Sequence, residues 1–347
     1  MNIKQSTLAA AVTAALAMGV SGQAAALVYA GSALEIKDLT VRFVDSAGIP
    51  VAQQPVSSFQ FTATNTATLN GVSAVVGTGG NGLLTATCGG TIASNNCGPG
   101  GLTGPVLDPG AGNAPGSAPF RPNNDFSFWG PGANQYSNSD SVIHQSELTL
   151  NGTTRIQQIA ESELQGNGAG NSNAEITSST GFTMTFTVVG TNNLKVDFDA
   201  DPYLRVKILD ALFDNGNAQA NVNATFSLTQ DATGDAVTWD PQGTTANDCT
   251  VDSGLTGVGC REDNDDQDLN RNLSISSNPN DVAHPGVGFG NFGITISGLS
   301  TGDWTLAFNA VTSNSIRRVP EPGMLALLGI GLLGMGAAAS RRRKLRG

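Results

Sequence analysis

The chain has 347 residues, with 28 acidic and 17 basic side chains and a formal net charge of −11. Charged residues make up 13% of it, whereas glycine occupies 44 positions. Such a chain lacks the surplus of Lys and Arg that binding to nucleic-acid phosphates requires. The composition favours an extracellular β-protein with long Gly- and Asn-rich loops over a cytosolic enzyme.

The N-terminus has the features of a secretory signal peptide. Lys4 supplies a positive charge, residues 8–20 form an apolar run rich in Ala, and Ala24, Ala25 and Ala26 offer a small-residue cleavage site. The apolar run is too short to span a bilayer. We therefore predict that residues 1–26 are removed and that residues 27–318 form the exported body.

Apolar and polar residues alternate in many stretches of the body, which predicts half-buried β-strands. The stretches cover residues 34–43 (with an irregularity between Ile36 and Leu39), 59–63, 182–188, 194–198, 204–208, 220–228, 292–296 and 304–310. Short alternating strands separated by turn residues are typical of an all-β fold, and we predict a jelly-roll-like β-sandwich. Trp304 alternates with Leu306 and Phe308, so we place it in the core.

Two stretches depart from this alternation. Residues 76–140 are rich in Gly, Pro and Asn, and they form either a loop insertion or a linker between two domains. Residues 153–165 are the one helix-like piece, since Ile156, Ala160 and Leu164 fall near helical spacing. A strand is the alternative for this second stretch.

Four cysteines in an exported chain favour disulfide bonds. They are Cys88, Cys97, Cys249 and Cys260. Three pairings exist, and the local one, Cys88–Cys97 with Cys249–Cys260, is favoured because each bond closes a short loop. Each bond would stabilise the fold by about 2–3 kcal/mol through loop closure. A zinc site is disfavoured, because there is no CxxC motif.

The body is strongly acidic, and one acidic stretch lies on a predicted strand. Without Lys4, the tail cations and Glu321, the body keeps 11 basic and 27 acidic residues, so its net charge is −16. On a strand, Asp197, Asp199 and Asp201 share one face, where their charges repel unless they meet a cation or water. Calcium, which takes six to eight oxygen ligands, is the candidate cation. The alternative is a solvated outer face, partly neutralised by cations such as Arg205 and Lys207.

A second acidic stretch, residues 262–272, contains four candidate calcium ligands: Asp263, Asp265, Asp266 and Asp268. Part of it matches the start of an EF-hand loop, but Arg271 stands where that loop needs Gly, so the EF-hand match fails. The stretch is either a different calcium loop, held by the neighbouring Cys249–Cys260 bond, or a solvated acidic loop. Asp240, Asp248 and Asp252 would add to the acidic surface.

The sequence offers no recognisable catalytic constellation. The two histidines, His144 and His284, lie in no HExxH or triad context, and there is no G-x-S-x-G motif or P-loop. We therefore predict that the protein is not an enzyme. A pair of carboxylates for glycoside hydrolysis stays the third interpretation.

The C-terminal tail has three parts in a fixed order. A signature, Val319, Pro320, Glu321 and Pro322, precedes an uncharged segment, residues 323–340. As a helix this segment would be about 27 Å long, close to the roughly 30 Å of a hydrocarbon core. The basic stop that follows would stay on the cytoplasmic side, and it consists of Arg341, Arg342, Arg343, Lys344 and Arg346. The body then lies across the membrane from the cytoplasm.

Residues 319–347 resemble the PEP-CTERM sorting signal of exported bacterial proteins, which exosortase enzymes read. The resemblance implies that the segment holds the chain in the inner membrane until an exosortase cuts near Pro320. The body is then released toward the cell surface and the extracellular polymer. The alternative is a plain single-pass anchor, which has no use for the signature.

These features favour an exported surface or matrix protein with a structural or adhesive role on extracellular polysaccharide. The alternative is a calcium-dependent carbohydrate-binding module, in which Trp129 and Trp239 stack on sugars. A secreted glycoside-acting enzyme is third.

Overall fold

The protein is seen in a computed structural model that describes twelve segments of the chain. They are residues 26–52, 54–69, 72–81, 88–89, 102–103, 126–131, 136–144, 154–166, 172–209, 214–244, 246–276 and 280–320. Within them the regular structure is entirely β-strand, and no helix long and apolar enough to cross a membrane is found there. Residues 1–25 of the predicted signal peptide, Cys97 and the tail beyond Pro320 lie outside the described residues, whereas Ala26 is the first residue of β1.

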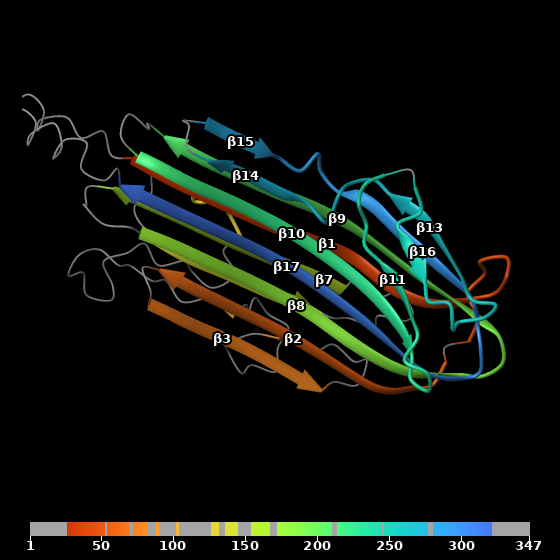
Figure 1. Cartoon of the computed structure of the whole chain (residues 1–347). Coiled ribbons are helices and arrows are strands. Elements are labelled where there is room, and N and C mark those ends of the chain that lie inside the picture. Colours follow the sequence, from red (N-terminus) through yellow and green to blue (C-terminus); the bar gives the residue numbers. More distant parts are fainter. Residues whose placement is uncertain are drawn as a thin grey trace, which may run out of the picture.

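The strands form two antiparallel sheets (Figure 1). Sheet A has nine strands in the order β13 (Gly259–Asp265), β16 (Gly290–Leu299), β9 (Asn192–Leu209), β1 (Ala26–Val44), β7 (Thr154–Gly166), β6 (Tyr136–His144) and β4 (Cys88–Gly89), with β15 (Asn280–His284) beside β9 and β5 (Leu102–Thr103) beside β6. Sheet B has eight strands in the order β12 (Cys249–Val251), β11 (Ala236–Trp239), β10 (Asp214–Gln230), β17 (Gly302–Pro320), β8 (Ser172–Val188), β2 (Val56–Leu69) and β3 (Val72–Asn81), with β14 (Asn272–Ser276) beside β10.

The core lies between the two sheets, as the alternation predicts. In β9 every second residue from Leu194 to Ile208 is buried, while the residues between them are partly exposed. Phe198 of sheet A stacks on Phe226 of sheet B with ring centroids 5.4 Å apart. Trp304, predicted to be in the core, is 0% exposed. The all-β prediction is confirmed, with the sheets face to face, whereas the jelly-roll-like connectivity stays a prediction.

Of the two structures considered for residues 153–165, the helix is wrong and the strand is confirmed, because β7 covers Thr154–Gly166. It pairs with β1 on one side and with β6 on the other, in the middle of sheet A. Ile156, Ala160 and Leu164 are spaced by four, which fits one face of a strand as well as one face of a helix. The backbone N–H and C=O groups of β7 form hydrogen bonds with β1 and β6. These long-range hydrogen bonds favour the strand over the helix.

The irregularity predicted between Ile36 and Leu39 is present as a register shift of β1, and Asp38 there has φ 55°.

The Gly-rich residues 76–140 contain two short strands. Here β4 and β5 pair with β6 at one end of sheet A. The division into an insertion or two domains stays a prediction.

Candidate functional site

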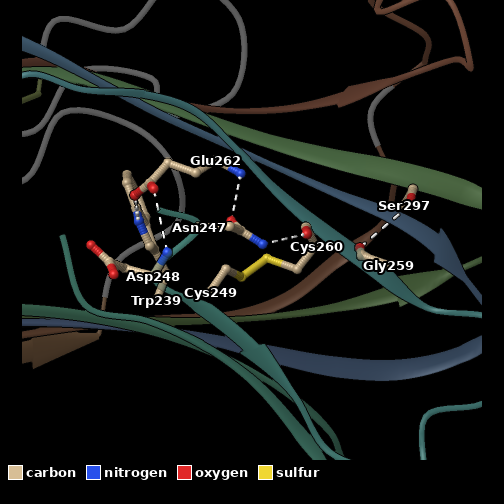
Figure 2. Close-up of a disulfide and its surroundings, with 8 residues drawn as sticks. All are labelled: Trp239, Asn247, Asp248, Cys249, Gly259, Cys260, Glu262 and Ser297. Atoms are coloured by element: carbon tan, nitrogen blue, oxygen red, sulfur yellow. Dashed lines mark hydrogen bonds between the residues drawn. A yellow bond between two sulfur atoms is a disulfide. The ribbon is translucent and has the colours of Figure 1, made fainter. Parts of the chain in front are cut away.

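A disulfide joins the edges of the two sheets. Cys249 lies in β12, at the edge of sheet B, and Cys260 lies in β13, at the edge of sheet A (Figure 2). Their Cα atoms are 6.1 Å apart, so the structure places these two cysteines as a pair capable of the predicted bond. The side chain of Asn247 supports this junction, donating to the Cys260 carbonyl at 3.2 Å and accepting from the Glu262 N–H at 3.0 Å. For Cys88, the predicted partner Cys97 lies outside the described residues.

Three carboxylates converge beside this disulfide. Ligand atoms of Asp248, Glu262 and Asp265 all lie within 4.8 Å of one another, and no other group of three such side chains is found in the described segments. Glu262 is positioned by two donors: the indole Nε1 of buried Trp239 at 2.6 Å and the backbone N–H of Asp248 at 3.4 Å. We call these three residues the acidic cluster.

Asp265 is the most constrained member of the acidic cluster. Its Oδ2 accepts the backbone N–H groups of Gln242 at 3.0 Å and Gly243 at 2.6 Å. Its Oδ1 is buried and has no hydrogen-bond partner among the described residues. Burial, opposed by the Gly243 N–H and reinforced by the charge of Glu262, raises the pKa of Asp265 to about 6. Gly243 is needed here, since it has φ +67° and a Cβ would lie 2.5 Å from the backbone of Asp268.

The remaining predicted ligands of this stretch have other partners. Asp263 pairs with Arg261 at 2.7 Å and accepts from Thr295 Oγ1 at 2.6 Å. Asp266 accepts the backbone N–H of Asn291 at 2.8 Å, and Asp268 accepts that of Asn270 at 2.8 Å. The structure therefore brings only Asp265 of the four predicted ligands into the acidic cluster.

Sequence reasoning missed Glu262 as a ligand because of an irregularity in β13. The register shifts between Glu262 and Asn264, where β13 pairs with Ile294 and then directly with Gly293 of β16. A bulged residue reverses the alternation of faces, so Glu262 and Asp265 come to one side although they are three positions apart. Asp248 was recognisable, because the predicted disulfide brings its neighbour Cys249 next to Cys260.

The other predicted calcium ligands form part of a ladder of ion pairs on sheet A. Asp197 contacts Arg42 Nη2 at 2.5 Å and Lys195 Nζ at 2.8 Å, and Asp199 lies 3.7 Å from Lys37 Nζ. Burial, and then the charge of Glu35, raise the pKa of Asp201, whose Oδ1 has no described partner. The three residues share one face, as expected, but cations already neutralise two of them.

Arg205 and Lys207 do not pair with the aspartates of their own strand, which is where the sequence places them as possible partners. Both pair with Asp281 of the neighbouring strand β15, at 2.8 and 2.7 Å. Hydrogen bonds from Arg205 and Lys207 lower the pKa of Asp281 to about 2. Arg205 and Lys207 are therefore both committed to Asp281 and do not neutralise Asp197, Asp199 or Asp201.

The two tryptophans that were expected to stack on sugars have other contacts. Trp239 is only 1% exposed and packs against Phe226, with ring centroids 5.4 Å apart, so the prediction of an exposed Trp239 is wrong. Trp129 is half-buried and meets Tyr136 edge to face at 5.3 Å. Trp129 is therefore already in ring contact within the protein.

The sorting signature begins inside the folded body. In β17, Val319 pairs with Asn215 and Pro320 pairs with Asp214 of β10. Arg318, just before them, is 7% exposed and lies between Gly216 of β10 and Ser172 of β8. Glu321, Pro322, the apolar segment and the basic stop lie outside the described residues.

In the sequence, the all-β body is followed by a short signature, an apolar segment and a basic stop, an order that implies an exported protein sorted through its C-terminus. The signal is the PEP-CTERM protein-sorting motif, whose family model matches residues 318–344 and confirms the predicted resemblance. This motif implies exosortase processing, export and sorting to the cell surface. No curated protein and no solved structure matches the chain.

Proposed function

We propose that this chain is a structural or adhesive protein of the cell surface that associates with extracellular polysaccharide after its tail is removed. The PEP-CTERM motif at residues 318–344 carries the proposal. A sorting signal of this kind is useful only if the body that precedes it functions outside the cell. The sandwich, with its disulfide across two sheet edges, suits an oxidising exterior.

The proposed role is not catalytic. His284, a candidate acid or base, lies 2.8 Å from Arg271 Nη1, and burial, then the charge of Arg271, lower its pKa. Glu262 is held by Trp239, and Asp197 is paired with two cations. These groups are occupied with structural contacts. Turnover on a panel of glycans by the purified body would contradict this part of the proposal.

The intact mass of the protein from surface and membrane fractions tests the sorting. We expect a surface form that ends within residues 319–323. Replacing Pro320, Glu321 and Pro322 with Ala should leave the full-length form in the inner membrane. The control is Arg317→Ala, an exposed residue just outside the matched segment, which should be processed normally. A wild-type protein found only at full length in the inner membrane would overturn the proposal.

A second proposed function is that of a calcium-dependent carbohydrate-binding module whose calcium binds at the acidic cluster. The observation in its favour is the convergence of three carboxylates within 4.8 Å, with Asp265 Oδ1 buried and unpartnered among the described residues. Calcium prefers oxygen ligands of this kind and completes its coordination with backbone carbonyls and water. Calorimetric titration with Ca²⁺ tests the site, and heat no greater than that of dilution would contradict it.

A further inference from the structure

A polar groove of about 550 Å³ opens where three connections of the chain meet. Gln242 and Gly243, after β11, form one wall, and residues 266–272, between β13 and β14, form the floor. His284 and Val287, at the start of the β15–β16 connection, form the other wall. Its volume is within the range of small-molecule sites, which runs from about 300 to 1,000 Å³.

The floor of this groove is fixed before any ligand arrives. The side-chain amide of Asn270 donates to the carbonyls of Ala224 at 3.1 Å and Pro241 at 3.0 Å. Gln267, which is 8% exposed, donates to the Gly288 carbonyl at 2.6 Å. A preformed site loses little conformational entropy on binding, which favours affinity.

Arg271 is the one Lys or Arg among the described residues that line the groove. Seven other Lys and Arg side chains of the described segments lie within 4.0 Å of a carboxylate: Lys37, Arg42, Arg155, Lys195, Arg205, Lys207 and Arg261. Arg271 forms no such pair there, and instead meets His284 Nε2 at 2.8 Å. Because a guanidinium has only N–H donors, His284 Nε2 is the acceptor of this hydrogen bond, and burial and the charge of Arg271 lower the pKa of His284. The guanidinium keeps further N–H donors for a ligand.

Acceptors lie beside these donors. Asp266 Oδ2 is bound by Asn291, and Asp268 Oδ1 by the N–H of Asn270, which leaves the second oxygen of each carboxylate without a described partner. Val287, 84% exposed, adds an apolar surface at the rim. Donors, acceptors and an apolar contact within one groove suit a ring whose neighbouring hydroxyls both donate and accept and whose C–H face is apolar.

The charges decide between neutral and acidic ligands of this type. Two carboxylates line the groove beside one guanidinium, and the chain as a whole has a net charge of −11. A polyanion would be repelled by this field. An uncharged polyol meets no such repulsion, and the carboxylates become acceptors for its hydroxyl groups.

We propose that this groove binds a neutral saccharide unit, with Arg271 donating to one ring hydroxyl and Asp268 accepting from its neighbour. The inference rests on the proposed association with extracellular polysaccharide and assigns it a site. The Asp266 carboxylate lies on the same groove, and Val287 contacts the apolar face of the sugar ring.

Affinity electrophoresis in gels containing a neutral glucan, mannan or galactan, or a polyuronate, tests this site with the protein released at the cell surface. We expect retardation by at least one neutral polymer. Arg271→Ala should weaken it about tenfold, as the loss of hydrogen bonds from a charged group implies. The control is Arg261→Ala, which removes the same charge from a side chain that is 76% exposed and outside the groove.

A second variant separates the loss of a sugar contact from a loss of folding. Val287→Asp changes a side chain that is 84% exposed, so it should leave thermal unfolding unchanged and still weaken retardation. Neutral-polymer retardation that neither variant changes would overturn the groove site while leaving the polysaccharide role in place. Retardation by the polyuronate alone would overturn the neutral class. Retardation by no polymer would overturn both the site and the polysaccharide role, whereas sorting is judged separately by the intact mass.

Discussion

The indole of Trp239 and the carboxylate of Glu262 are joined by a hydrogen bond of 2.6 Å, and they belong to different sheets. Trp239 lies in the aromatic core, with Phe198 and Phe226 against its ring. Glu262 is a member of the acidic cluster. This one contact therefore couples the packing of the core to the geometry of the candidate metal site.

Glu262→Ala should destabilise the fold by about 1–3 kcal/mol, because it leaves a buried indole N–H without its acceptor. Glu262→Gln keeps an acceptor oxygen in place and should cost less than half as much. Urea unfolding, followed by tryptophan fluorescence, measures both. Equal midpoints for Glu262→Ala and the wild type would show that the hydrogen bond contributes nothing.

Removing the disulfide should open the edge of the sandwich. Because Cys249 and Cys260 have a sequence separation of 11, the Cys249→Ser, Cys260→Ser double variant should lose about 2–3 kcal/mol of stability. The matched control is the wild type under reducing conditions, which should unfold at the same denaturant concentration. A double variant as stable as the oxidised wild type would contradict a stabilising role for this bond.

The titration of Asp265 predicts a pH dependence of stability. Its pKa is raised from 3.8 to about 6 in the folded protein, so the folded state binds more protons than the unfolded state between these values. The contribution of this group to the free energy of unfolding should therefore fall as pH rises from about 4 to 6 and stay level above. Asp265→Asn should remove this fall. Thermal unfolding across that pH range measures it, and identical profiles for the two proteins would refute the assignment.

Calcium should offset the loss of stability that comes with ionisation of Asp265, because a bound cation favours the ionised carboxylate. At pH 7, calcium at a hundred times its dissociation constant should stabilise the fold by about 2.7 kcal/mol, an effect that a chelator removes and Asp265→Asn abolishes. The control is Asp199→Asn, at a position that the sequence also proposes as a ligand but that lies beside Lys37. Loss of the calcium effect in Asp199→Asn, with Asp265→Asn unaffected, would place the ion on β9 instead.

The sequence predicts the strands well where alternation is long, and poorly where long-range pairing decides. Phe182, Met184 and Phe186 are buried as the alternation indicates. Val237 and Trp239 alternate with Ala236 and Thr238 and are buried in that alternation, but the strand has only four residues. So short a run does not identify a strand by itself, and the pairing of Trp239 with Phe226 of β10 is what places the strand in sheet B.

The candidate site was predictable in part. The local pairing of Cys249 with Cys260 follows from their spacing, and it brings Asp248 toward the acidic stretch. The bulge at Asp263 does not follow from the sequence, because it depends on how β13 meets Gly293 and Ile294 of β16. Without it, period-two reasoning puts Glu262 and Asp265 on opposite faces of the strand.

The position of the sorting signature in β17 has a mechanical consequence. Pulling on the C-terminus acts along a strand that is hydrogen-bonded on both sides, to β10 from Gln230 to Asp214 and to β8 from Val188 to Ser172. Such a load shears two ladders at once instead of peeling hydrogen bonds one by one. We expect force spectroscopy from the C-terminus to give a higher rupture force than pulling β2 away from its edge of the sheet. A tail that tethered the body to a membrane would therefore load the sheet along β17 and its two neighbouring strands.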